Sequence, residues 1–387
     1  MNMVEYSEYR LGSLCNRFSS GKGIPADLIN ETGKYPVIGG NGLRGYTDTY
    51  NFDGECAVIG RQGAYCGNVQ FFSGKGYMTE HAVVTQPNSA NNAKYLTYKL
   101  NGLSLGRFSG QAAQPGLSVT KLARLRIEMP PKWYQDKVAG ILYAYDNLIE
   151  VNNKRIKVLE QMAENLYKEW FVRFRFPGHE TSGFENGIPK GWNVCRFSSI
   201  ANVLSGGTPS TDHDEYYGGN IPFYTPKDSS DDYFVFDTIS KLTEEGLQHC
   251  NSQLYPKNTI MITARGTVGN LNLLAKPMAM NQSCYALTSN TIPSQYFLFF
   301  LIKREILKLR KMASGGVFDT IIVSTFDHIK VTIPDKSLIM SFDMLVSPIL
   351  DETYTLLKQN RNLIRQRDLL LPRLMSGKLE VQYALND

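Results

Sequence analysis

A long apolar heptad pattern that occurs twice constrains the fold of this chain more than any other sequence feature. In the first copy, seam residues lie alternately four and three positions apart from Val138 to Trp170. A matching seam runs from Val346 to Leu374. This spacing is typical of a long helix that packs one face against a partner helix. Two ordinary surface helices explain it less well, because the seam is longer than most globular helices.

An asparagine occupies the same seam position in both copies, Asn152 in the first and Asn360 in the second. A polar residue in such a seam lowers stability but fixes the register of the paired helices. The sequence therefore predicts that the two long helices form a coiled coil. A two-fold-like arrangement of the copies makes this coiled coil antiparallel and brings Asn152 near Asn360.

The residues that precede each helix also repeat. Tyr35-Pro36-Val37 matches Ile221-Pro222-Phe223, and Ile127-Glu128-Met129-Pro130 matches Val331-Thr332-Ile333-Pro334, in the same order along the chain. In both copies short β-like runs, such as 55–60 and 259–263, are interrupted by glycine and by helical pieces. We therefore expect an α+β fold with two similar heads, each followed by a long helix.

The expected order along the chain is head, helix, linker, head, helix. The stretch between the copies is rich in glycine and proline, which break a helix and indicate a linker. The predicted boundaries are 1–131 for the first head, 132–176 for its helix, 177–190 for the linker, 191–335 for the second head, 336–378 for its helix and 379–387 for a C-terminal tail.

Polar, glycine-rich loops recur in both heads and are the candidate binding surface. Arginine reads guanine, asparagine or glutamine reads adenine, and lysine or threonine suits phosphates. The simpler alternative for any single residue is a solvated turn, in which Arg61 and Arg265 hold structural carbonyls; recurrence of the set in both heads favours DNA contact. The candidates are Lys22, Arg44, Arg61, Gln62, Tyr65, Gln111 and Gln114 in the first head, and Thr208, Lys227, Asp228, Arg265, Thr267, Asn281 and Gln282 in the second.

Composition is typical of a globular protein. Of 387 residues, 42% are hydrophobic and 20% charged, and the formal net charge of +5 permits a polyanionic partner without requiring one. Six scattered cysteines suggest reduced thiols rather than a disulfide framework. No stretch approaches the roughly 18 apolar residues of a membrane span, and the first residues lack a signal core. We therefore expect a cytoplasmic protein with no membrane partner.

Motifs for catalysis are missing from the sequence. It contains no G-x-x-x-x-G-K-S/T, G-x-G-x-x-G or H-E-x-x-H pattern. Pro334-Asp335-Lys336 superficially resembles a nuclease carboxylate–lysine set, but its counterpart Pro130-Pro131-Lys132 lacks the acid, so we interpret it as a turn. The five histidines do not cluster in the sequence. We therefore predict no catalytic centre, no metal site and no cofactor in this chain.

Several segments resemble a known family. Residues 152–171, with 173–178 after them, are similar to the central conserved region of type I restriction–modification specificity subunits, and residues 367–379 resemble the distal conserved region of that family. Residues 187–192 resemble the usual opening of its second target-recognition domain, where 205–209 and 264–269 also recur. The resemblance covers nearly the whole chain, and it is looser in the first head.

The resemblance implies a non-catalytic subunit that recognises double-stranded DNA. Each target-recognition domain would read half of a bipartite target, and the coiled coil would set the gap between the halves. Two methyltransferase (modification) subunits would dock on this subunit, and restriction/translocase subunits would join through them. S-adenosylmethionine, ATP and Mg would belong to these partners. The alternative is a coiled-coil scaffold with two ligand-binding heads that does not bind nucleic acid, suggested by the modest net charge.

Overall fold

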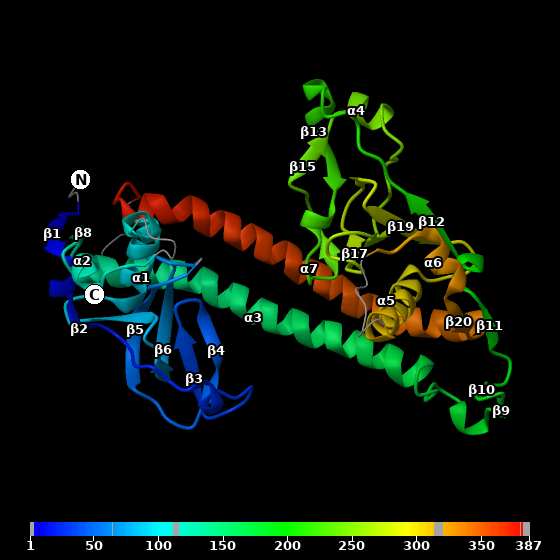
Figure 1. The fold of residues 1–387 in the computed structure, drawn as a ribbon, viewed down its shortest axis with the longest axis horizontal. Helices are drawn as coiled ribbons and strands as arrows, with labels where there is room; N and C mark the ends of the chain where they lie inside the picture. The colour runs from blue at the N-terminus through cyan, green and yellow to red at the C-terminus, as the bar shows by residue number, and fades with distance from the viewer. Residues whose placement is uncertain (1–3, 64, 111–115, 313–319, 380, 382–387) are drawn as a thin grey trace, which may run out of the picture. The chain divides into compact units, whose positions relative to one another are not determined.

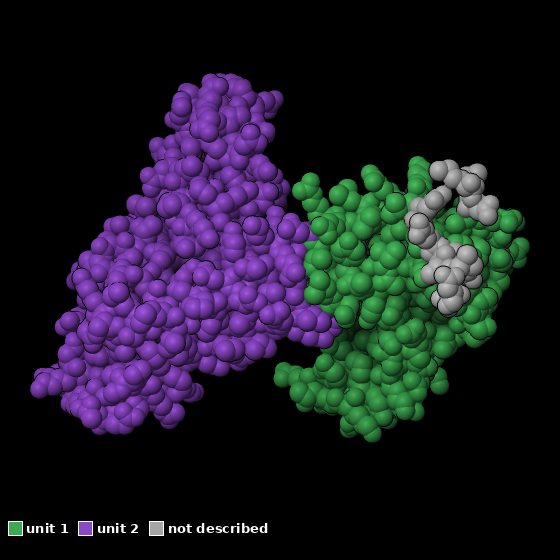
Figure 2. Space-filling view, turned by 180° about the vertical axis from the view of Figure 1, so that it is seen from behind, with its two compact units in different colours: residues 1–149, 363–387 green, residues 150–362 purple. Residues whose placement is uncertain are grey.

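The computed structural model describes residues 4–63, 65–110, 116–312, 320–379 and 381, with Lys311 and Met312 described by their backbone only. The chain divides into two compact units (Figure 2): unit 1 comprises residues 1–149 and 363–387, and unit 2 comprises residues 150–362. Two forty-residue helices, α3 (Lys132–Phe171) and α7 (Lys336–Met375), cross the boundary, so each contributes to both units.

Unit 1 is built around a six-stranded sheet (Figure 1). Its strands lie in the order β2 (Cys15–Ser20), β7 (Ala82–Pro87), β5 (Phe52–Gly60), β6 (Val69–Met78), β3 (Tyr35–Gly39) and β4 (Gly42–Thr47). All neighbouring strands are antiparallel except β3 and β6, which are parallel. Helix α1 (Ala93–Gly102) packs on β5 and β6, because Tyr95, Leu96 and Leu100 form one buried face at helical spacing.

A small two-stranded sheet joins the beginning of unit 1 to its long helix. Strand β1 (Ser7–Arg10) pairs antiparallel with β8 (Arg126–Met129), directly before α3. The remaining short elements of unit 1 are η1 (Leu11–Leu14), η2 (Ala26–Leu28), η3 (Leu105–Phe108) and α2 (Val119–Ala123). The buried core includes Tyr134 and Val138 of α3 as well as Leu374 of α7, so both long helices stabilise this unit.

Unit 2 repeats the architecture with its sheet divided in two. One sheet has the order β12 (Ala201–Ser205), β19 (Cys284–Ser289), β16 (Ile260–Thr263), β17 (Leu271–Leu274) and β14 (Phe234–Val235), and the other β15 (Ser240–Leu242), β13 (Tyr217–Tyr224) and β18 (Ala279–Met280). The other elements are β9 (Phe184–Glu185), β10 (Ile188–Pro189), β11 (Asn193–Arg196), β20 (Lys330–Ile333), η4 (His179–Thr181), η5 (Phe197–Ser199), η6 (Asp214–Tyr216), η7 (Pro226–Asp228), α4 (Glu244–Gln248), α5 (Gln295–Met312) and α6 (Val323–His328).

The predicted internal repeat appears in the strand pairing. Strands β11 and β20 of unit 2 pair as β1 and β8 do in unit 1. The parallel pairing of β13 with β18 corresponds to that of β3 with β6. The single strand β6 is replaced in unit 2 by β17 and β18, and Pro277 lies between them. Because proline cannot donate a ladder hydrogen bond, the strand that is continuous in unit 1 is interrupted in unit 2.

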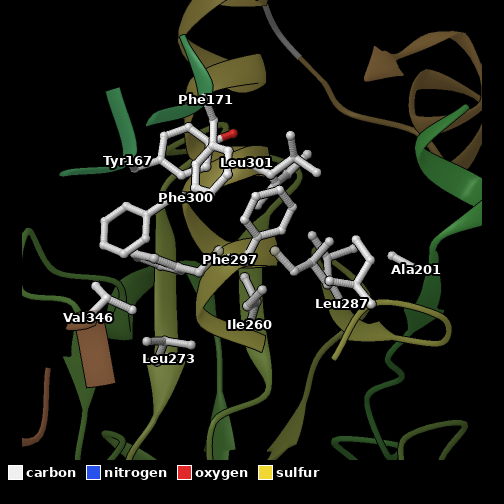
Figure 3. Close-up of a cluster of buried hydrophobic side chains, with 14 of the residues drawn as sticks. Tyr167, Phe171, Ala201, Ile260, Leu273, Leu287, Phe297, Phe300, Leu301 and Val346 are labelled. Carbon is white, nitrogen blue, oxygen red and sulfur yellow. The ribbon is translucent and has the colours of Figure 1, made fainter. Parts of the chain in front are cut away.

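Aromatic side chains from the long helices and α5 pack together in the core of unit 2, and Figure 3 shows those of α3 and α5. Tyr167 and Phe171 of α3 pack against Phe297 and Phe300 of α5, with ring centroids 4.9 to 5.9 Å apart. Phe342 of α7 lies 5.1 Å from Phe171. Each of these side chains is at least 97% buried. The second head is therefore fixed to segments of both long helices.

Contacts between α3 and α7 within each unit pair residues in opposite order along the chain. In unit 2, Asn152 Nδ2 donates to Asn360 Oδ1 over 2.9 Å, and Arg155 forms an ion pair with Glu352. In unit 1, Tyr134 donates its hydroxyl hydrogen to the carbonyl oxygen of Leu374 over 2.9 Å. Later residues of α3 thus meet earlier residues of α7.

The ends of the long helices differ slightly from the predicted segments. Helix α3 ends at Phe171 rather than at 176, and Phe174 beyond it has a φ of 58°, which is incompatible with a continuing helix. Helix α7 begins at Lys336, where Asp335 Oδ1 accepts a hydrogen bond from the backbone N–H of Leu338. Hydrogen bonds from Ser337 and Leu338 lower the pKa of Asp335. The Pro334-Asp335-Lys336 stretch is therefore a helix cap.

Candidate nucleic-acid interface

Unit 2 contains an open groove of about 690 Å³ between its loops, and it gathers five of the predicted residues. These are Thr208, Lys227, Arg265, Thr267 and Asn281. They come from four separate loops, so the fold brings together side chains that lie far apart in the sequence. A lysine, an arginine, an amide and two hydroxyls in one open groove can contact both phosphates and base edges.

Arg265 follows the last residues of β16 and lies at the start of a tight turn. Gly266 has a φ of 80°, a conformation that favours glycine. The backbone N–H of Ala264 donates to the carbonyl oxygen of Ser283, and that of Gly269 to Thr263, each over 2.8 Å. The turn is thus held by its backbone. The Arg265 side chain is exposed, and no hydrogen bond to it is present among the described residues.

Other hydrogen bonds of the candidates in unit 2 hold the groove's own loops. Asp228 Oδ2 accepts a hydrogen bond from the backbone N–H of Thr225 over 2.9 Å, and Asp228 Oδ1 accepts one from Ile239 over 2.7 Å. Thr208 donates its hydroxyl hydrogen to Gln282 Oε1. Asp228 therefore positions the loop that carries the exposed Lys227, and Gln282 orients Thr208.

In unit 1, Arg61 has a structural role. Its Nε donates to the carbonyl oxygen of Leu117 over 3.2 Å, and its Nη1 lies 3.4 Å from Ser20 Oγ. This matches the structural alternative considered for Arg61. The next residue, Gln62, is exposed, and Tyr65 is exposed over 56% of its surface. Both side chains are therefore accessible to solvent.

The remaining candidates of unit 1 lie on other loops and strands. Lys22 is exposed, and its backbone N–H donates to the carbonyl oxygen of Met78 over 3.0 Å. Arg44 is exposed on β4, and its side chain lies close over Gly39. Gln111 and Gln114 lie outside the described residues.

Sequence reasoning missed some residues that line the groove of unit 2, among them Tyr217 and Ser283. Tyr217 begins β13 and donates its hydroxyl hydrogen to the carbonyl oxygen of Pro209 over 2.8 Å. No sequence signal distinguishes Tyr217 from the other tyrosines of the chain. Its position in the groove follows from the pairing of β13 with β15 and β18.

The described residues contain no group of three or more histidine, cysteine, aspartate and glutamate side chains that could hold a metal ion. Burial raises the pKa of Cys15, Cys56 and Cys284 to about 12, which keeps these thiols protonated and unreactive. Within the described ranges, no helix is long and apolar enough to cross a membrane.

Together, two similar α+β units with exposed polar loops and two long shared helices define a two-headed binding protein. The family model for the type I restriction modification DNA specificity domain matches residues 3–161 and 189–359, one match for each copy of the repeat. The chain therefore belongs to the family of type I restriction–modification specificity subunits, which confirms the family expected from its motifs.

Individual relatives agree with the family match. The type I restriction enzyme HindI specificity subunit of Haemophilus influenzae is 26% identical over 327 residues, covering 68% of this chain and 71% of the relative. The EcoprrI specificity subunit of Escherichia coli is 37% identical over 166 residues, which are 42% of this chain and 41% of the relative. The crystal structure of a type I S subunit from M. genitalium shares the fold, with a TM-score of 0.69, 17% identity and 97% coverage of both chains.

Proposed function

We propose that this chain reads a bipartite double-stranded DNA target, with one half-site for each unit. The observation that carries the proposal is the groove of unit 2, where Lys227, Arg265 and Asn281 converge from separate loops. Among the residues that the structure describes, neither Lys227 nor Arg265 forms an ion pair with a carboxylate that would neutralise its charge. Lys227 suits a phosphate, while Arg265 and Asn281 suit base edges in the major groove. The family match with two copies supports a second reading surface in unit 1.

The two long helices act in this proposal as an antiparallel coiled coil that sets the gap between the half-sites. The hydrogen bond from Asn152 to Asn360 supports it, since a buried polar pair is satisfied in one register only. Asn360 also donates to Asn153 Oδ1 over 2.8 Å, and Asn152 donates to Gln359 Oε1 over 3.0 Å. This near-symmetric set of amide bonds holds the register from both sides.

Catalysis belongs in this proposal to partner subunits. Two methyltransferase (modification) subunits dock on the chain and modify the DNA that it holds, and restriction/translocase subunits join through them. S-adenosylmethionine, ATP and Mg are then bound by those partners. The alternative, a scaffold that does not bind nucleic acid, is not favoured, because the family model that matches both copies describes a DNA specificity domain.

A matched insertion tests the proposal. One heptad is added to α3 between Ile149 and Glu150, and one to α7 between Asn362 and Leu363, so that the seam stays in phase. Seven residues lengthen a helix by about 10.5 Å, the rise of about three base pairs. We expect mapping of modified adenines to show a gap about three base pairs longer and both half-sites unchanged.

A matched control places seven polar residues after Gly183, in the exposed linker, and should leave the gap unchanged. Altered half-sites, or a gap between the half-sites that keeps its length after the helix insertion, would contradict the proposal. The absence of salt-dependent DNA binding, even with the methyltransferase subunits present, would favour the scaffold alternative.

A further inference from the structure

The turn that presents Arg265 in unit 2 has a structural counterpart in unit 1, and the two turns can be superposed by their backbone hydrogen bonds. Ala264 donates its N–H to the carbonyl oxygen of Ser283, and Ile321 donates to Ala264. In unit 1 the same two bonds are made at Arg61, which donates to His81 and accepts from Leu117. Arg61 therefore corresponds to Ala264, and the residue that corresponds to Arg265 is Gln62.

The glycines of the two turns support this register. Gly63, with a φ of 84°, directly follows Gln62, and Gly266, with a φ of 80°, directly follows Arg265. The turns close at Gly67, with a φ of 89°, and Gly269, with a φ of 80°. Unit 1 has one more residue between its two glycines than unit 2. The extra residue of unit 1 thus lies after Gln62, and it does not change the correspondence of Gln62 with Arg265.

Gln62 and Arg265 are both exposed, and neither side chain has a hydrogen bond or an ion pair among the described residues. Their neighbours differ: the Arg61 guanidinium is bound to Leu117 and Ser20, whereas Ala264 is buried. The fold therefore holds the backbone of the turn and leaves the side chains of Gln62 and Arg265, at corresponding positions, free to select a partner.

We infer that Gln62 and Arg265 are corresponding specificity positions, each selecting the base at the equivalent place of its own half-site. This inference rests on the proposed DNA-reading function and adds the residues that carry it. Arginine donates two hydrogen bonds to O6 and N7 of guanine, and glutamine bonds N6 and N7 of adenine. The half-site read by unit 1 then has an adenine where that of unit 2 has a guanine.

An exchange of the two side chains tests this inference in the complex of the full chain with its modification subunits. The variants are Gln62→Arg and Arg265→Gln, and modified adenines are mapped for each. We expect Gln62→Arg to replace adenine by guanine at one position of one half-site, and Arg265→Gln to make the reverse change in the other half-site. Preference for the old base should fall about ten- to one-hundred-fold.

Arg196→Gln is a matched control, because Arg196 is an exposed arginine of unit 2 on β11 and lies outside the groove, so its variant should keep the wild-type target. A wild-type complex with a bipartite target and variants whose targets stay unchanged would overturn the inference and leave the proposed function standing. A wild-type complex that modifies DNA without a sequence preference would overturn both.

If a complex that carries Gln62→Arg or Arg265→Gln modifies no DNA, alanine variants test the inference instead. Gln62→Ala and Arg265→Ala are then compared in competition binding with duplexes altered at one position at a time. Relaxed selectivity at a single position of one half-site supports the inference. An equal loss of affinity for every duplex shows a phosphate contact or a structural role and overturns it.

Discussion

The two heads share the backbone hydrogen bonds of one turn, which presents Gln62 in unit 1 and Arg265 in unit 2. The sheets that carry this turn differ. In unit 1 the turn follows a nine-residue strand in a continuous six-stranded sheet, whereas in unit 2 it follows a four-residue strand in a divided sheet. Yet the backbone bonds at Arg61 and at Ala264 are the same. The comparison teaches that the repeat conserves the backbone frame of the turn while the strands around it and the side chain at its tip diverge. Such a frame can change its ligand without changing its fold.

The largest expected effect comes from two corresponding glycines that lie against the end of a neighbouring strand. A Cβ added at Gly21 would lie 2.0 Å from the carbonyl oxygen of Met78, and one at Gly206 would lie 2.4 Å from that of Met280. Because backbone must move in both cases, Gly21→Ala and Gly206→Ala should each lower the free energy of unfolding by about 3 kcal/mol. Denaturant unfolding measures the loss.

Two other glycines are suitable controls, since a Cβ added at Gly102 or Gly183 meets no atom within 4 Å. Alanine at these positions should leave the unfolding midpoint nearly unchanged. If only one of Gly21→Ala and Gly206→Ala is destabilising, the two heads do not share the same packing at this point, and the structural comparison fails there.

The next effect concerns the two matched asparagines. Asn152 is 1% and Asn360 5% exposed, and each donates to an amide on the other helix. Asn152→Leu leaves Asn360 with a buried, unpaired amide oxygen and should cost about 2 kcal/mol. Asn152→Leu combined with Asn360→Leu should recover most of that loss, because an apolar pair replaces the polar one. A double-mutant cycle in urea measures the coupling.

Asn165→Leu is the control for this cycle, because Asn165 is an exposed asparagine of the same helix and its variant should be nearly neutral. Losses that simply add for Asn152→Leu and Asn360→Leu would show that the two amides act independently. The proposed role of this pair in fixing the register would then be lost.

The smallest effect comes from Glu160, whose counterpart in the helix repeat is Asp368. Asp368 is exposed and pairs with Arg367, but Glu160 is packed beside Tyr233, whose backbone N–H lies 3.2 Å from Glu160 Oε1. Burial raises the pKa of Glu160 to about 7, with Lys303 opposing the shift and the nearby carboxylates of Asp232 and Glu164 adding to it.

A raised pKa means that the folded state holds the proton more tightly than the unfolded state does. The contribution of Glu160 to the free energy of unfolding is therefore fully present below its unfolded pKa of about 4.5. It is lost as the pH rises through the folded pKa of about 7. Glu160→Gln should leave stability unchanged near pH 4.5 and raise it by about 1 kcal/mol at pH 8, allowing for solvent screening. Thermal unfolding across this range measures the difference. Glu150→Gln, which removes an exposed carboxylate from the same helix, is the control, and the same trend in both variants would refute the burial effect.

The periodic parts of the fold could be predicted from the sequence. The seam from Val138 and the seam from Val346 correspond to α3 and α7, and the repeat of Val37 and Phe223 appears as the parallel pairing of β3 and β13 with their partners. These features depend on local spacing and on matched motifs, which a linear sequence displays directly.

Parts of the candidate site could not be predicted, because they depend on which atoms a side chain meets. The sequence gives no sign that Asp228 accepts hydrogen bonds from Thr225 and Ile239, or that Arg61 is bound to Leu117. Nor does it show the correspondence of Gln62 with Arg265, since the two arginines are the more similar residues and only the backbone hydrogen bonds set the register.

By itself the amino-acid sequence determined that this protein has two related heads and two long helices with an asparagine at the same seam position. The physical reason is that helical periodicity and an internal repeat are local or translational patterns. Tertiary structure decided which polar residues are free and which are bound within the fold. That choice depends on hydrogen bonds between residues distant in the chain, such as that of Arg61 with Leu117, and these exist only once the strands have paired.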